Sequence, residues 1–328
     1  MTMDAVKQKQ TMRQRIAAVT DFREFMILYI IVLTVIAMAY AVPQFLGGQN
    51  ISAVLLSMSD QSIIATGMTI LLISGGFDLS VGSTVGLSGA VTAIWLTGGM
   101  PAGVAILMGL AVGVLIGLIN GLLIAEVGIN PFVTTLGMMS LVRGMHMVVT
   151  EGQNISNLPK AFTALGQGYF YHIQYPIFIS LVLVCAGDFL LRRSRFFRQN
   201  YYIGGNEKAA ILSGINVKGV KVFNYVLTGL LAAFAGVIIT ARLGSASTTA
   251  GQGLELKVIS AVIIGGASLR GGVGTVAGAF LGALLMSIII SSINLLSIDI
   301  YWVDFAMGAA LLAAVIVDKL SKQGNELL

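Results

Sequence analysis

Long apolar runs, separated by short polar or glycine-rich segments, extend through most of the chain. A run of about 17 to 25 apolar residues is long enough to cross the hydrocarbon core of a bilayer as an α-helix. The pattern therefore predicts an all-α, polytopic membrane protein. About ten transmembrane helices are expected, at residues 25–42, 51–74, 80–97, 102–126, 131–150, 175–191, 221–241, 255–267, 275–296 and 302–318.

Two of these runs depart from the simple pattern. The eighth run is short, and the second contains Asp60 and Gln61. Short or polar segments at membrane depth are typical of helices that break inside the protein. A continuous helix and a broken or re-entrant one are therefore both open for these two runs.

Basic residues predict how the chain is oriented. They gather in the N-terminal segment 1–24, in the polar stretch 192–221 and in the tail 319–328. Basic segments favour the cytoplasmic side, and ten spans place all three on that side. The predicted organisation is a cytoplasmic N-terminal segment, helices 1–6 at 25–191, a cytoplasmic loop at 192–221, helices 7–10 at 222–318 and a cytoplasmic tail.

The composition excludes a soluble protein. Hydrophobic residues make up 56% of the 328 residues and charged residues only 10%, so the chain has too few polar groups to cover a water-exposed surface. The net charge of +5 lies mostly in the basic segments. It is therefore interpreted as an orientation signal, and no nucleic-acid partner is expected.

The sequence has none of the common catalytic or nucleotide-binding motifs. It lacks a GxxxxGK[ST] phosphate loop and a GxSxG element, and its two histidines, His146 and His172, have no neighbours at metal-ligand spacing. No catalytic residue, metal or cofactor is therefore expected, and any ATP is expected on a partner subunit.

Arg143, toward the outer end of the fifth run, is expected to extend its side chain to the membrane interface.

Glycine spacing predicts how the helices pack. Gly109, Gly113, Gly117 and Gly121 recur at intervals of four and share one face of the fourth span. Such a face lets a neighbouring helix approach closely, and a ligand-lining groove is the alternative.

Two glycine-rich segments also resemble each other. Residues 75–90 and 265–283 each begin with a Gly-Gly pair, and each leads into a helix with small residues four apart. Gly82, Gly86 and Ala90 in the first segment correspond to Gly274, Gly278 and Gly282 in the second. Because both segments are expected on the same side, they predict a like-oriented internal repeat, a common feature of transporters.

Five stretches of the chain resemble one known family, the permease subunits of bacterial ABC importers for monosaccharides (ribose, arabinose, galactose, xylose) and the related autoinducer-2 permeases. The stretches follow the family's order along nearly the whole chain. They are GMTILLISGGFDLSVGS at 67–83, INPFVTTLGMMSLVRG at 129–144, IGGNEKAAILSGINV at 203–217, GLELKVISAVIIGGASLRGGVGT at 253–275 and INLLSIDIYW at 293–302.

The resemblance implies a type II-like ABC importer permease in the bacterial inner membrane. Such a permease works as a membrane dimer with a second permease subunit, either the same or paralogous. An ABC ATP-binding subunit lies on the cytoplasmic side, and a periplasmic sugar-binding protein delivers the solute. The resemblance also implies that the short stretch around 204–217 couples the permease to its ATPase.

Residue chemistry fits that coupling role. Asn206 is a favourable N-cap, and Glu207 follows in the first turn, where the helix dipole favours a negative charge. Ala209 and Ala210 favour helix, and Gly214 is suited to end it. Gly204 and Gly205 precede this helix and complete the coupling set. A basic loop that only binds anionic lipid is the alternative, and we favour it for the arginines of 192–198.

Three residues are candidates for the solute path: Asp60, Gln61 and Glu255. Asp60 and Gln61 are suited to hydrogen-bond a hydroxylated solute, and a polar pair on a buried helix interface is the alternative. Glu255 matches an acidic position near the outer mouth in the family. Asp78 and Ser80 are expected to cap the third span.

The sequence therefore predicts a non-catalytic permease subunit of an ATP-driven importer for a monosaccharide or a similar small hydroxylated solute. An ATP-independent secondary carrier or facilitator is the main alternative, and an intramembrane enzyme is disfavoured. The sequence does not determine which sugar is carried.

Overall fold

We describe the chain from a computed structural model, over residues 24–299, 301–303, 305–306, 308–309, 312 and 316. This part is almost entirely helical. Its elements are a first helix Glu24–Ala41, η1 (Pro43–Leu46), α2 (Gly48–Ile73), α3 (Val81–Thr97), α4 (Ala102–Ala125), α5 (Pro131–Thr150), α6 (Lys160–Gln167), β1 (Tyr169–Phe170), β2 (Ile173–Gln174), α7 (Tyr175–Arg193), α8 (Arg195–Gly205), α9 (Glu207–Leu212), α10 (Val217–Leu243), α11 (Leu254–Ile264) and α12 (Val276–Leu295).

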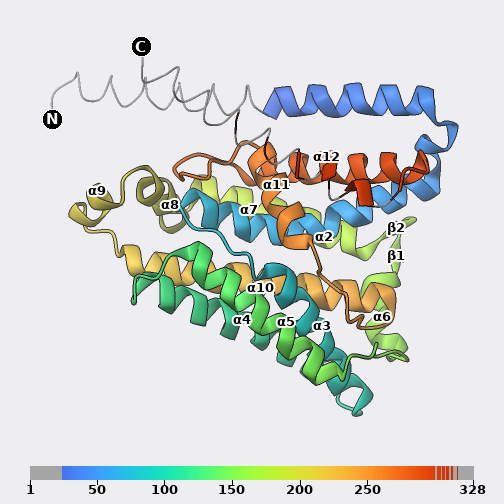
Figure 1. Cartoon of the computed structure of the whole chain (residues 1–328), viewed down its shortest axis with the longest axis horizontal. Coiled ribbons are helices and arrows are strands. Elements are labelled where there is room, and N and C mark those ends of the chain that lie inside the picture. Colours follow the sequence, from blue (N-terminus) through green and yellow to red (C-terminus); the bar gives the residue numbers. More distant parts are fainter. Residues whose placement is uncertain are drawn as a thin grey trace.

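The long helices run roughly along the long axis of the molecule (Figure 1). α8 and α9 lie at one end, which we call the α9 end. The β1–β2 hairpin and α6 lie at the other, which we call the hairpin end. Glu24 pairs with Arg192 at 3.8 Å and accepts a hydrogen bond from Thr275 at 2.6 Å, so the first helix begins, α7 ends and α12 begins near one another.

Seven of the described helices are long and apolar enough to cross a membrane, and α3 is a shorter apolar helix of 17 residues. The predicted all-α, polytopic architecture is therefore confirmed. α2 is one continuous helix of 26 residues, so the break considered near Asp60 and Gln61 does not occur. The segment 302–318 falls largely outside the described residues, as do nearly all of 1–24 and the tail 319–328.

α11 is a half-length helix. Its 11 residues span about 16 Å, which is too short to cross a bilayer alone. The connection that precedes it, 244–253, enters the bundle: Gly251 lies against Gly82 at the start of α3. α11 therefore begins inside the bundle, and Ile264 ends it near the α9 end, where Gly271 approaches Gly204.

α10 is the central helix, and it contacts α2, α3, α4 and α6. The glycine face of α4 allows the closest of these contacts. Gly113, Gly117 and Gly121 face the backbone of α10, whereas Gly109 faces α3. A side-chain carbon at Gly113 would collide with the carbonyl oxygen of Gly229, so the two helices approach at a distance that only glycine permits.

The glycines of the second resembling segment also lie at helix contacts. Gly278 and Gly282 of α12 face the backbone of α11, and Gly274 lies against Ala267 in the connection between these helices. α2 and α11 each end at a Gly-Gly pair in which one glycine has positive φ, Gly75 at 86° and Gly266 at 94°. The two segments therefore share their helix–Gly-Gly–helix organisation.

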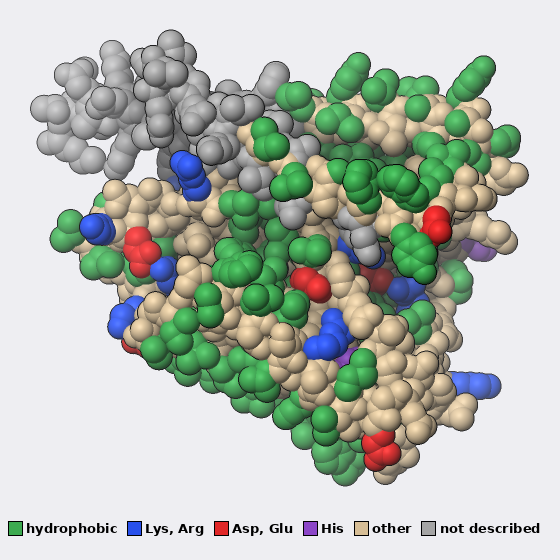
Figure 2. Space-filling model, viewed as in Figure 1, with side chains coloured by type: hydrophobic (Ala, Val, Ile, Leu, Met, Phe, Trp, Pro, Cys, Tyr) green, Lys and Arg blue, Asp and Glu red, His purple; other side chains and the backbone are tan. Residues whose placement is uncertain are grey.

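The connection between α5 and α7 folds into α6 and the small antiparallel hairpin β1–β2. These elements are not predicted by the pattern of apolar runs. Tyr169 and Phe170 are exposed on the hairpin, and Tyr171 and His172 at its turn have positive φ. Hydrophobic side chains cover much of the visible face, and one group of charged side chains lies at the end that α8 and α9 occupy (Figure 2). This distribution fits a body surrounded by lipid with a polar end.

Candidate functional site

α9 is the short helix that the sequence predicts after Asn206. The Asn206 side chain accepts a hydrogen bond from the Ala209 N–H at 3.0 Å, so it caps the helix as expected. Glu207 lies in the first turn. Gly214 has φ of 80°, a conformation that favours glycine, and it follows the last turn. α10 then begins at Val217, inside the stretch predicted as a loop.

One face of α9 is packed and the other is open. Ala210 is buried with Ile203, Val217 and Val220 in a small hydrophobic cluster. Ile211 and Leu212 lie on the open side, and Leu212 is 89% exposed. An exposed leucine beside charged residues is typical of a surface that binds a partner.

A hollow of about 550 Å³ lies beside this open face. It is formed by α9, the start of α10 and the connection between α4 and α5, and Ile129, Asn130 and Pro131 line its far wall. Glu207 lines it as well and is paired with Lys221 at 2.8 Å. The hollow and the exposed apolar residues form one continuous surface, which we call the α9 surface.

α8 and α9 are joined firmly to the bundle. Asn224 of α10 is fully buried and donates to Asn200 Oδ1 of α8 at 2.7 Å and to Ser74 Oγ at 3.1 Å. Gly204 packs against the carbonyl oxygen of Ile73 and against Gly272. These contacts join α8 to the end of α2 and to α10, and buried polar contacts of this kind are costly to break.

Tyr201 adds a contact from α8 to the connection before α12. Its hydroxyl donates to the Gly274 carbonyl oxygen at 2.8 Å. Burial and the nearby carboxylate of Asp188 raise the pKa of Tyr201 to about 12. The hydroxyl therefore keeps its proton, and the hydrogen bond, at every physiological pH.

A second candidate site is a polar pocket of about 210 Å³ between α2, α10 and the connection that leads into α11. It contains two of the three predicted path residues, Asp60 and Gln61, on α2. Gln61 donates to Ser57 and Ser287 at 3.2 Å each. Lys257 of α11 lines the same pocket, and Arg242 of α10 pairs with Asp60 Oδ2. We call this cavity the Asp60 pocket.

Sequence reasoning missed Arg242 as a member of this site, and it placed Lys257 only near the outer mouth, beside Glu255. Both are basic residues in or beside apolar helices, and such a residue is a signal for a functional or paired position. Asp60 is 182 residues from Arg242, so no local pattern shows that they meet. Only the packing of α10 against α2 brings the two charges together.

Glu255, the third predicted path residue, does not line the Asp60 pocket. It lies in the first turn of α11 and faces Gly82 of α3. Arg143 lies nearby on α5 and donates to the Ala250 carbonyl oxygen at 2.9 Å. The expectation that Arg143 reaches the membrane interface is therefore wrong, because its guanidinium is used to hold the connection that enters the bundle.

The predicted cap of the third span is confirmed in its position but not in its hydrogen bond. Ser80 is the N-cap residue of α3, but its side chain makes no capping hydrogen bond. Asp78 instead accepts from the Ser80 N–H at 2.7 Å and from its hydroxyl at 2.6 Å. Asn120 of α4 donates to the same pair. The buried carboxylate thus fixes the Gly-Gly loop against α4 rather than closing the helix.

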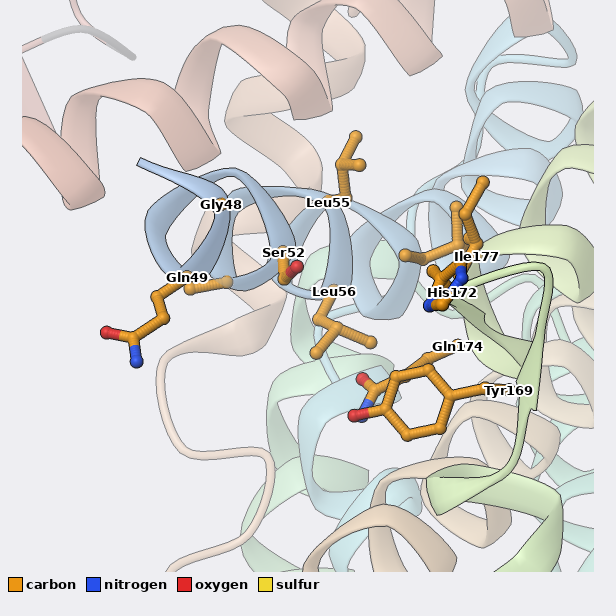
Figure 3. Close-up of a pocket in the computed structure, with 11 residues that line it drawn as sticks. Gly48, Gln49, Ser52, Leu55, Leu56, Tyr169, His172, Gln174 and Ile177 are labelled. Atoms are coloured by element: carbon orange, nitrogen blue, oxygen red, sulfur yellow. The ribbon is translucent and has the colours of Figure 1, made fainter. Parts of the chain in front are cut away.

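A groove of about 440 Å³ lies at the hairpin end, between the start of α2 and the β1–β2 hairpin. Figure 3 shows Leu56, Tyr169 and Gln174 close together on one side of it, with Gln49 pointing outward. Gln174 donates to the Tyr169 hydroxyl at 3.0 Å. α2 therefore connects this groove at one end of the molecule to the Asp60 pocket farther along the helix.

Seven apolar helices of membrane-spanning length among the described residues define the protein as a polytopic membrane protein. A family model described as the permease component of the branched-chain amino acid transport system matches residues 50–315. The chain belongs to this family.

Relatives with named functions cover nearly the whole chain. The ribose import permease protein RbsC of Bacillus subtilis is 39% identical over 318 residues, which is 95% of this chain and 98% of the relative. That of Haemophilus influenzae is 39% identical over 280 residues, with 84% and 87% covered. The L-arabinose transport system permease protein AraH of Escherichia coli is 36% identical over 290 residues, 88% of each chain. The predicted resemblance to sugar importer permeases is confirmed.

Proposed function

We propose that this protein is the membrane-spanning subunit of an ATP-driven importer that carries a monosaccharide or a similar small hydroxylated solute. The observation that carries the proposal is the α9 surface, an exposed apolar patch and hollow at the polar end of a permease that has no phosphate loop of its own. The names of the ribose and arabinose permeases support a sugar as the solute.

The α9 end is the cytoplasmic end in this proposal, so the N-terminus and the tail 319–328 are cytoplasmic and the hairpin end faces outward. The concentration of basic residues around α8 supports this orientation. The proposed membrane is the bacterial inner membrane, crossed by about ten helices with a like-oriented repeat at 75–90 and 265–283. The binding protein then docks at the hairpin end, and a second permease subunit completes the dimer.

The ABC ATP-binding subunit is proposed to dock on the α9 surface. The coupling residues are Gly204, Gly205, Asn206, Glu207, Ala209, Ala210 and Gly214. Closure of the ATPase displaces α9, and the contacts of Asn200 and Gly204 pass this displacement to α2 and α10. These two helices carry the Asp60–Arg242 pair. The proposed result is alternating access of the pathway, along which Asp60, Gln61 and Glu255 lie.

The energy source distinguishes this proposal from a secondary carrier. In cells that make ATP only by glycolysis, arsenate is expected to stop accumulation of radiolabelled ribose by depleting ATP. A protonophore, which collapses the proton gradient, is expected to leave accumulation largely intact. The reverse pattern, loss with the protonophore and persistence with arsenate, would assign the chain to the secondary carriers.

A further inference from the structure

The Asp60 pocket contains hydrogen-bond acceptors without donors. Asp60 is 8% exposed and Gln61 is 2% exposed. Asp60 Oδ1 and Gln61 Oε1 are buried and have no partner among the described residues. An unpartnered buried polar atom costs about 1–3 kcal/mol, and such atoms are kept where a ligand or water satisfies them.

The same pocket contains a donor without an acceptor. The side chain of Lys257 lines the cavity and makes no hydrogen bond or ion pair within the described part of the chain. An ammonium group donates up to three hydrogen bonds. Asp60 and Gln61 of α2 and Lys257 of α11 therefore line the same space.

The charges around the cavity favour a neutral ligand. One oxygen of Asp60 is already paired with Arg242, so the carboxylate is largely compensated. A free cation would be repelled by Arg242 and Lys257, and a free anion would meet the unpaired oxygens of Asp60 and Gln61. A neutral molecule with several hydroxyl groups can donate to the acceptors and accept from the ammonium group at once.

We propose that Asp60, Gln61 and Lys257 form a subsite that binds adjacent hydroxyl groups of a neutral monosaccharide during passage. One hydroxyl donates to Asp60 Oδ1 and its neighbour to Gln61 Oε1, while Lys257 Nζ donates to an oxygen of the same solute. This subsite rests on the proposed function, and it makes Lys257 a specificity-determining residue of the pathway.

The experiment compares uptake of D-ribose and 2-deoxy-D-ribose by the assembled transporter in cells, because the second sugar lacks one hydroxyl of an adjacent pair. Lys257→Met keeps the side-chain length and removes the donor. Asp60→Asn keeps the shape and removes the charge. Lys160→Met is the matched control, because Lys160 is exposed on α6 and its ammonium group makes no hydrogen bond or ion pair with the described residues.

Lys257→Met is expected to lower the rate of ribose uptake at saturating sugar at least tenfold. It is also expected to bring the ratio of the ribose uptake rate to the 2-deoxyribose uptake rate close to one. Asp60→Asn is expected to act in the same direction, and Lys160→Met to leave both quantities unchanged. The amount of Lys257→Met protein in the membrane and its thermal unfolding temperature should match the parent, because the change breaks no hydrogen bond or ion pair.

An unchanged ratio and rate in both pocket variants would overturn the subsite. A lower ribose uptake rate with an unchanged ribose-to-deoxyribose ratio would also overturn it. The pocket would then affect passage of the sugar without binding its hydroxyl groups. Ribose uptake that does not depend on ATP would contradict the proposed function instead. The ribose-to-deoxyribose uptake ratio would still test the pocket in that case. The two failures are thus distinguishable.

Discussion

Replacement of Leu212 by Asp is expected to abolish sugar uptake while the protein stays folded in the membrane. Leu212 is 89% exposed, so the change removes almost no contact within the chain. It does place a charge on the α9 surface, where the ATP-binding subunit is proposed to dock. Loss of a central apolar anchor from an interface typically costs about 2 kcal/mol or more, which is about 30-fold in affinity.

The measurement is ribose uptake together with co-purification of the ATP-binding subunit. Met100→Asp is the control, because Met100 is also exposed but lies between α3 and α4, outside the α9 surface. Both variants should reach the membrane in equal amounts, and only Leu212→Asp should lose uptake and partner. Normal uptake by Leu212→Asp would remove the α9 surface from the coupling mechanism.

Replacement of Gly113 by Leu is expected to prevent folding. A carbon atom at this position meets the carbonyl oxygen of Gly229 and the side chain of Ala233. Backbone atoms of a helix cannot rotate away, so α4 and α10 must separate. Overpacking of a core usually lowers the free energy of unfolding by about 1–3 kcal/mol, and by more where the neighbouring atoms cannot move. Here the affected contact involves the central helix.

Gly103→Leu provides a control on the same helix. A carbon atom added at Gly103 meets no other atom within 4 Å, so the change keeps the α4–α10 contact. Membrane-inserted protein and its thermal unfolding temperature are the readouts. We expect little or no folded Gly113→Leu protein and a near-normal amount of Gly103→Leu protein. Equal stability of the two variants would contradict the glycine-mediated contact.

The helices could be predicted from the sequence because membrane spans follow from local composition. The predicted run 131–150 matches α5 at both ends, and Asn206 and Gly214 mark the ends of α9 because capping depends on neighbouring residues. The hairpin between α6 and α7 was missed, since its aromatic residues are equally typical of a membrane interface.

The Asp60 pocket shows what local patterns cannot predict. Asp60 and Gln61 were identifiable as polar residues in an apolar run, but their partners lie on α10 and α11. Arg143 illustrates the converse error: its position near a helix end suggested exposure, whereas the connection 244–253 enters the bundle and supplies a carbonyl oxygen to it. In both cases the contacts are set by packing between segments that are far apart in the chain, and the local sequence pattern does not show them.

Reconstitution in liposomes tests the central claim, that this permease moves sugar only when a separate ATPase drives it. Radiolabelled ribose uptake is measured for the purified full chain alone and for the chain with its ATP-binding subunit, its binding protein and ATP. The account predicts no uptake above empty liposomes for the chain alone and ATP-dependent uptake for the full set. Ribose transport by the chain alone, unaffected by ATP, would contradict it.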